Sequence, residues 1–303
     1  HVVSSGSFSN TDGVGVHFSY SGADAGSTDL VNDATPQLGG DLDLNSRSID
    51  FPTTANISDC KDEDNMASNS ATMLATQQSI KAYVDTSAGS TSRNYIINGA
   101  MEVAQRGTSH TTAAQTYLLD RFYTYTPAAN RTISQVTDAP DGFKHSIKLA
   151  RDSGTAVDPQ YFSQPCESSA SVGAAGETIT LSFWAKAGAN FSPTSSYISV
   201  AVYSGTGTNQ TLMAGLSGAV AVIGATNQAI TTSWVRYEFT GGSVVPTDSN
   251  QLVFQIVTTP TGTAGANDWY EITGIQIEIG DSATNYAHES FGDTLRKCKR
   301  YYQ

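Results

Sequence analysis

The chain has 303 residues, of which only 15% are charged, and it is rich in Gly, Ser, Thr and Ala. This composition is typical of secreted or virion β-structure, and the sequence has no run of about 18 apolar residues, which excludes a transmembrane helix. The formal net charge of −12 argues against nucleic-acid binding, because that binding needs clustered Lys and Arg side chains. Residues 1–93 hold 12 acidic and 4 basic side chains, so the negative charge is concentrated near the start.

The first sixty residues consist of short alternating segments separated by turn residues. Val14, Val16 and Phe18, for example, alternate with a glycine and a histidine. The pattern is strand-like, but it holds too little apolar surface for a core within one chain. We therefore expect residues 1–62 to form an extended β shaft in which three copies wrap around one another. A disordered acidic linker is the alternative.

The next segment, residues 63–92, contains the only helix that the sequence predicts with a clear pattern, over residues 65–86. Met66, Met73 and Ile80 recur at intervals of seven, which keeps one seam facing a partner helix in a supercoil. We expect a short junction helix in a threefold bundle, with these three residues as the trimer seam. A lone amphipathic helix that packs on the next domain is the alternative.

Residues 93–290 predict one all-β domain, because strand-like segments recur at regular intervals with turn signals between them. The clearest strand is 178–184, where Ile179, Leu181 and Phe183 share one face. About ten strands without intervening amphipathic helices predict a two-sheet sandwich of jelly-roll type. The further strands that we name lie at 197–203, 234–240, 252–257 and 269–279.

The C-terminal segment, residues 291–303, is basic, and we interpret it as a segment that can lead into a further domain. We interpret its cations as a solvated helical or linker face, with phosphate binding as the alternative. The three cysteines are far apart and no CxxC occurs, so neither a zinc site nor a disulfide framework is predicted. Because the sequence opens with His1, we expect upstream residues to be missing. The cations are Arg296, Lys297, Lys299 and Arg300, and the cysteines are Cys60, Cys166 and Cys298.

Four phrases follow one another from about residue 30 to the end: TPQLGGDLDLN at 35–45, MAS and ATQQSIKAYVD within 66–85, RNYIINGAM and VAQRG within 93–107, and IQIEIG, SFG and CKRYY within 275–302. In this order they resemble phrases of tail-fibre proteins from marine and cyanobacterial bacteriophages. The resemblance implies a homotrimeric fibre, assembled in the host cytoplasm, that joins phage tail or nozzle and adaptor proteins. It also implies attachment to a glycan or protein on the host cell surface. The alternatives are a capsid-attached head fibre or decoration protein, and a depolymerase-type tailspike.

The jelly roll also resembles a carbohydrate-binding module, with strands at 181–184, 234–237 and 275–280 in the usual order. Such modules often carry a structural calcium ion between a Glu near the first strand and an Asp near the last. Glu102 is the candidate Glu, but Ile272-Thr273-Gly274-Ile275 stands where the acidic partner is expected. Calcium takes six to eight oxygen ligands, and the missing acidic partner would remove one of them. No cofactor is therefore predicted, and Glu102 is kept as a weak calcium candidate.

No sequence motif of catalysis is present: GxSxG, HExxH and P-loop patterns are absent, and the five histidines are scattered. Asp138 and Asp141 are the nearest approach to an acid pair, and the intervening Pro and following Gly favour a turn. We therefore expect no enzymatic activity.

Sugar binding requires fewer specialised groups than catalysis does, namely an aromatic face and a few amide or charged groups. Trp184 lies on the strand face opposite Phe183, beside Lys186, and Trp269 has polar neighbours. These residues are candidates for a glycan platform, and packing in the core or between subunits is the alternative for each aromatic. Trp234 is expected in the core. The predicted platform is Trp184, Lys186, Asn267, Asp268 and Trp269.

Overall fold

The computed structural model describes residues 57–68, 70–90, 94–112, 116–117, 119–127, 131–152, 154–212 and 214–301. The chain divides into two compact units. One includes residues 57–61 and 70–74, and the other includes residues 62–68 and the chain from residue 75 onward. Among the described residues, no helix is long and apolar enough to cross a membrane. The shaft predicted over residues 1–62 lies outside the described residues as far as position 56.

Two short strands precede the single long helix of this part of the chain. Strand β1 (Asp59–Lys61) pairs with β2 (Met73–Ala75), and α2 covers Gln77–Ser90. The Thr76 side chain caps α2, because its Oγ1 accepts a hydrogen bond from the Ser79 amide at 3.0 Å.

The prediction of one helix over residues 65–86 is therefore wrong before position 77. Met66 lies outside any helix with a φ of 52°, Met73 belongs to β2, and only Ile80 is helical. The physical reason is local hydrogen bonding: the Asn65 side chain closes a turn by accepting from the Ala67 amide at 3.0 Å. The three residues proposed as a seam do not share one helical face.

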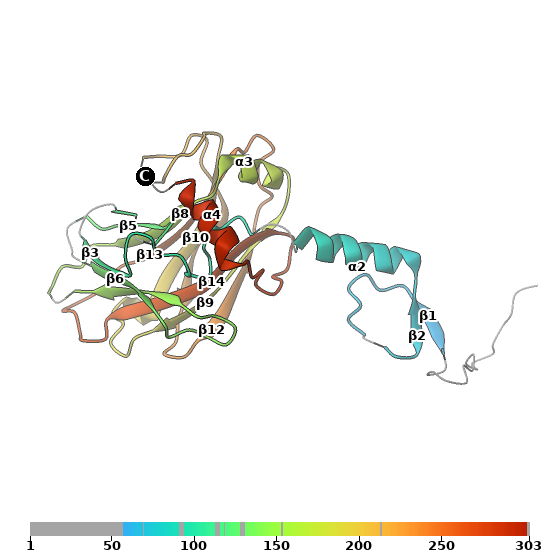
Figure 1. The fold of residues 1–303 in the computed structure, drawn as a ribbon, viewed down its shortest axis with the longest axis horizontal. Helices are drawn as coiled ribbons and strands as arrows, with labels where there is room; N and C mark the ends of the chain where they lie inside the picture. Colours follow the sequence, from blue (N-terminus) through green and yellow to red (C-terminus); the bar gives the residue numbers. More distant parts are fainter. Residues whose placement is uncertain are drawn as a thin grey trace, which may run out of the picture. The chain divides into compact units, whose positions relative to one another are not determined.

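The rest of the second unit is a β-sandwich, drawn in Figure 1 as two layers of strands. Within the described residues each layer has six strands, and the pairings are antiparallel. The prediction of a mainly β, jelly-roll sandwich is confirmed. In spatial order, sheet 1 consists of β11 (Val220–Ala229), β10 (Tyr197–Gly205), β13 (Gln251–Thr258), β8 (Gln160–Pro165), β5 (Tyr123–Tyr125) and β4 (Thr116–Tyr117). Sheet 2 consists of β12 (Val235–Thr240), β9 (Ile179–Ala187), β14 (Trp269–Ile279), β7 (Ser146–Arg151), β6 (Arg131–Val136) and β3 (Ser109–Thr112).

One apolar core fills the space between the two sheets. It includes Phe162 and Phe254 from sheet 1 and Leu181, Phe183 and Ile277 from sheet 2, all fully buried. In the second half of β9, the buried residues Phe183, Ala185 and Ala187 alternate with the partly exposed Trp184 and Lys186, as expected for successive side chains of a strand. The outward positions of sheet 2 are therefore free to carry polar and aromatic groups.

Short helices close the ends of the sandwich: α3 (Ser168–Ser171), η1 (Val172–Ala174), η2 (Thr194–Ser196) and α4 (Phe291–Lys299). Ser290 caps α4 by accepting a hydrogen bond from the Asp293 amide at 3.2 Å. Cys298, near the end of α4, is buried against Ile97 and Val103, so the basic C-terminal segment is packed onto the domain. Figure 1 shows α4 in red beside the strands.

Candidate functional site

All three tryptophans of the chain are half-buried, and each comes from sheet 2 or its margin. Trp184 alternates with inward residues on β9, Trp269 begins β14, and Trp234 stands directly before β12. The expectation that Trp234 lies in the core is wrong, because its indole Nε1 donates a hydrogen bond to Asp138 at 3.1 Å. The reason is that strand alternation directs Trp234 to the same side as Lys186.

Lys186 is the centre of this surface. Its ammonium contacts the Asp138 carboxylate and lies 3.3 Å from Oε2 of Glu271. The same ammonium lies 5.2 Å from the ring centroid of Trp234 and 5.6 Å from that of Trp269, within the range of cation–π attraction. We call this set the tryptophan surface. Its members are Asp138, Lys148, Trp184, Lys186, Trp234, Trp269 and Glu271.

The two carboxylates of the surface differ in protonation behaviour because their surroundings differ. Hydrogen bonds from Lys186 and Trp234 lower the pKa of Asp138, whose side chain is half exposed. Burial raises the pKa of Glu271, and nearby Lys186 and Lys148 only partly offset that effect. Burial alone would lower the pKa of Lys186, but the hydrogen bond to Asp138 and the charge of Glu271 raise it above its ordinary value.

Trp269 is held from two sides. The Lys148 ammonium lies 4.0 Å from its ring centroid and 3.8 Å from Oε1 of Glu271. The indole also lies against the backbone of Gly188, where an added Cβ would come within 2.6 Å of Trp269 Cε2. A glycine at position 188 therefore allows this indole to approach the backbone just after the end of β9.

Trp184 extends the surface in the other direction, toward the bulge in β14. The bulge falls between Thr273 and Gln276 and contains Gly274, whose φ of 63° favours glycine. A Cβ at Gly274 would meet the Phe143 ring at 2.6 Å and Trp184 Cδ1 at 3.1 Å. Trp184 and Phe143 thus share the space above one glycine.

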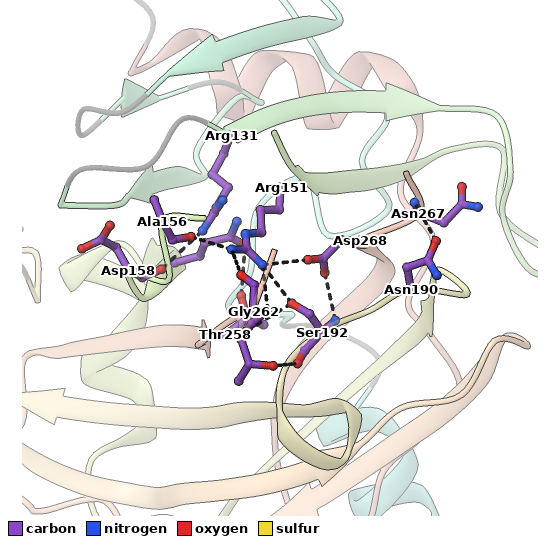
Figure 2. Close-up of polar contacts among 12 residues, drawn as sticks. Arg131, Arg151, Ala156, Asp158, Asn190, Ser192, Thr258, Gly262, Asn267 and Asp268 are labelled. Carbon is purple, nitrogen blue, oxygen red and sulfur yellow. Dashed lines mark hydrogen bonds and ion pairs between the residues drawn. The ribbon is translucent and has the colours of Figure 1, made fainter. Parts of the chain in front are cut away.

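The other predicted platform residues lie elsewhere or contribute little. Figure 2 shows Asp268 turned toward Arg151 and Ser192, where it accepts from the Ser192 amide at 2.9 Å and pairs with Arg151 at 3.2 Å. Asp268 is 3% exposed, so it does not join the tryptophan surface. Asn267 is exposed and lies 3.5 Å from the Trp269 indole nitrogen.

Arg151 holds this end of the sandwich together. Its guanidinium donates to Asp268 and Ser192 and to three backbone carbonyls, including Ala156 O at 2.8 Å. Arg131 lies nearby and donates to Asp158 O at 3.3 Å (Figure 2). Burial and the charge of Arg151 lower the pKa of Arg131 to about 10, which leaves it cationic at neutral pH.

The residues around Glu102 do not fit a calcium ion. Glu102 and Glu289 line a small recess together with Asn98 and His288. Within the described chain, no three His, Cys, Asp or Glu side chains gather closely enough to hold a metal. Within residues 272–275, where the resemblance places an acidic partner, the Thr273 side-chain hydroxyl donates to His145 O at 2.8 Å. Calcium binding at Glu102 therefore lacks the acidic partner that the resemblance expects from residues 272–275.

The tryptophan surface can bind a sugar in chemical terms. Aromatic rings supply faces for the C–H side of a pyranose, and the exposed Asp138 carboxylate and the partly exposed Lys148 ammonium can bond hydroxyl groups. The ammonium of Lys186 bonds both carboxylates, so it fills the space between them. A water molecule or a glycosidic oxygen would need that space in a glycosidase.

Sequence reasoning did not identify Lys148 and Glu271, and it considered Asp138 only as half of an acid pair with Asp141 and not as part of this surface. Lys148 and Glu271 alternate with core residues along β7 and β14, and this signal marks them as outward. The missing information was the strand order, because β14 lies between β9 and β7 although it is last in the sequence. Asp138 lies in the loop after β6, and its sequence neighbours do not indicate that Lys186 and Trp234 are its partners.

No protein-family model matches the chain, and no curated protein matches it by sequence. Among solved structures, the enzymatically active domain of tailspike protein 4 from bacteriophage CBA120 is similar, with 14% identity and a TM-score of 0.38 over 62% of this chain and 21% of that chain. A CBM4 structure has 17% identity and a TM-score of 0.35 over 60% and 98%. A cyclase from Fischerella sp. TAU has 10% identity and a TM-score of 0.39 over 64% and 100%. Likenesses at this level are not evidence for what this chain binds or does.

Proposed function

We propose that this chain is part of a homotrimeric bacteriophage tail fibre and that its sandwich binds a glycan on the host cell surface without cleaving it. The phage assignment rests on the ordered sequence phrases described above. The observation that carries the binding assignment is that Trp234 and Trp269 lie beside the Lys186 ammonium, while Trp184 stands two residues before Lys186 on the same side of β9. Large aromatics are usually buried in cores or interfaces, so three on one solvent-facing surface indicate a binding site.

The surface suits a neutral or weakly charged sugar. Asp138, Glu271, Lys148 and Lys186 carry two negative and two positive charges, which balance. A balanced surface gives no strong attraction to polyanions, and the rings then supply most of the contact energy. Hydrogen bonds to Asp138 and Lys148 would fix the orientation of the sugar.

The absence of cleavage is part of the proposal, and it is supported by the position of Lys186. Glycosidases need two carboxylates with free space for the glycosidic bond or for water between them. Here an ammonium bonds both carboxylates at once. Acid–base chemistry would first require breaking those two ion pairs.

Trimer formation is supported by apolar side chains that a single chain leaves exposed before the sandwich. Leu74 in β2 is 54% exposed, and Ile80 and Tyr83 on α2 are 49% and 46% exposed. Burying such residues stabilises an assembly by roughly 25 cal/mol per Å² of apolar surface removed from water. We expect sedimentation of the full chain as a trimer, and Leu74→Asp with Ile80→Asp to dissociate it.

The test of the function is binding to a glycan array together with an assay for released reducing ends. We expect saturable binding to at least one host polysaccharide and no release of reducing ends. Trp184→Ala should abolish the binding, whereas Tyr197→Ala, an exposed aromatic change on sheet 1, should leave it intact. Binding that survives Trp184→Ala unchanged, or release of reducing ends by the wild type, would contradict the proposal. Labelling the fibre on intact particles tests its place on the tail against a place on the capsid.

A further inference from the structure

A second cavity lies beside α4, away from the tryptophan surface, and we propose that it binds a sugar that carries a carboxylate group. The cavity has a volume of about 190 Å³. A single water needs roughly 10–15 Å³ of such space, so the cavity has room for a ligand larger than one water molecule. Its lining consists of Arg106, Tyr117, Asp120, Arg121, Cys298 and Tyr301.

Arg121 is the residue that points to an anion. It is 92% buried, being 8% exposed, and its guanidinium carbon lies 3.6 Å from the centroid of the Tyr301 ring. One of its five N–H donors is used by Pro165 O at 2.9 Å, while the buried Nε has no hydrogen-bond partner within the described chain. A buried guanidinium with unused donors favours an acceptor-rich, negatively charged ligand.

The backbone at Arg121 gives independent support. Its φ of 78° lies in the left-handed region, which a long side chain rarely adopts. Such conformations persist only where the surroundings fix them, and they gather at ligand clamps. Here the strained turn directs a guanidinium into the cavity, and the Phe122 amide secures the turn by donating to Leu119 O at 2.9 Å.

The acidic residue in the lining, Asp120, forms its hydrogen bonds with Gln105, and no ion pair joins it to Arg121 in the described part of the chain. Both carboxylate oxygens of Asp120 accept hydrogen bonds from Gln105, one from its amide at 2.6 Å and one from its side chain at 2.8 Å. Glu167, which precedes α3, pairs with Arg300 at 2.7 Å. The Arg121 guanidinium therefore keeps donors, including its Nε–H, that a ligand in the cavity can use.

The aromatic residues that line the cavity favour a sugar acid over a small inorganic anion as the ligand. Tyr117 is 39% exposed and Tyr301 is 40% exposed, and both line the cavity. Two partly exposed rings offer C–H contacts to a pyranose, and the guanidinium would accept its carboxylate. The tryptophan surface, by contrast, has balanced charges and no arginine with unused donors among its members.

The test is calorimetric titration of the full chain with D-glucuronate, D-glucose and inorganic phosphate. We expect one saturable glucuronate site per chain, with glucose and phosphate each binding at least tenfold more weakly. Arg121→Gln should reduce glucuronate affinity at least tenfold, because it removes a charge-assisted contact. Arg296→Gln is the matched control, since Arg296 lies on the exposed side of α4 and pairs with Asp293.

Arg121→Gln also removes the bond to Pro165, so Tyr117→Ala serves as a second variant that keeps that bond. It should weaken glucuronate several-fold and leave the melting temperature unchanged. The inference is overturned if the wild type binds no glucuronate, if phosphate binds as tightly as glucuronate, or if Arg296→Gln weakens binding as much as Arg121→Gln. Trp184→Ala should not affect glucuronate binding, so failure of this site and failure of the proposed glycan surface are separate results.

Discussion

Lys186 and Glu271 lie directly opposite each other across the β9–β14 pair, with the Lys186 ammonium 3.3 Å from Oε2 of Glu271. The Glu271 side chain is only 3% exposed, although it belongs to the outward side of the sheet. It is covered by the residues that surround it, including the indole of Trp269 and the ammonium of Lys148. A change in the charge of Lys186 or Glu271 is therefore expected to affect the position of the Trp269 ring through Lys148.

The first prediction concerns the coupling of this pair. Lys186→Gln leaves a buried carboxylate with only Lys148 as a partner, and we expect it to lower the free energy of unfolding by about 2 kcal/mol. A fully buried pair would lose about 3–5 kcal/mol on removal of one partner. The double variant with Glu271→Gln should recover part of the loss, as measured by urea denaturation. Strict additivity of the two single changes would show that the pair is not coupled.

The second prediction concerns pH. Because the folded-state pKa of Glu271 is raised, its protonated form stabilises the fold relative to the unfolded chain. That contribution is complete below the unfolded pKa, about 4.3, and is lost as the pH rises through the folded pKa. Tryptophan fluorescence should therefore show a transition above the ordinary Glu range, with Asp138 still ionised because its pKa is lowered. Glu271→Gln should remove the transition; a transition that persists belongs to another group.

The third prediction concerns the contact between Gly188 and Trp269. Gly188→Ala would place a methyl group 2.2 Å from the Asn267 carbonyl oxygen and 2.6 Å from the indole, so both the backbone at Asn267 and the ring must move. We expect a loss of about 1–3 kcal/mol in the free energy of unfolding, as for overpacked sites, together with a shift of tryptophan emission. Gly224→Ala is the control, because nothing lies within 4 Å of an added Cβ there. Equal effects of the two changes would contradict the described packing.

The fourth prediction concerns the buried cluster of Figure 2. The side chains of Arg151 and Asp268 are each 2% exposed, and Arg151 also bonds three backbone carbonyls. Arg151→Met should cost about 3–5 kcal/mol of unfolding free energy, because it leaves the Asp268 charge buried without its partner. Arg296→Met, on the exposed side of α4, should cost less than about 1 kcal/mol. Similar denaturation midpoints for the two variants would overturn this account of the cluster.

Strand periodicity in the sequence was sufficient to predict the sandwich. Alternation along residues 178–184 identified the inward face of β9, and the strand predicted at 269–279 coincides with β14. The seven-residue spacing led to a wrong helix prediction at Met66 and Met73. The Asn65 side chain closes a turn beside Met66, and the Thr76 side chain caps a helix that begins only at Gln77. Periodicity alone could not exclude that competing local structure.

The candidate site was only partly predictable. Trp184, Lys186 and Trp269 were recognised from their types and their positions on strands. Glu271 and Lys148 were not recognised, because their role depends on β14 lying between β9 and β7. Asp268 was misleading for a related reason: a carboxylate next to a tryptophan in sequence points to the opposite side of a strand.

The most direct test of the central claim, that sheet 2 binds glycan through its tryptophans, is a titration observed on the indole N–H signals. The chain has three tryptophans, so a ¹⁵N–¹H spectrum should contain three such signals. On addition of the polysaccharide fragment found by array binding, we predict that the Trp184 and Trp234 signals shift with one common dissociation constant. Three indole signals that stay fixed while other resonances titrate would contradict the claim.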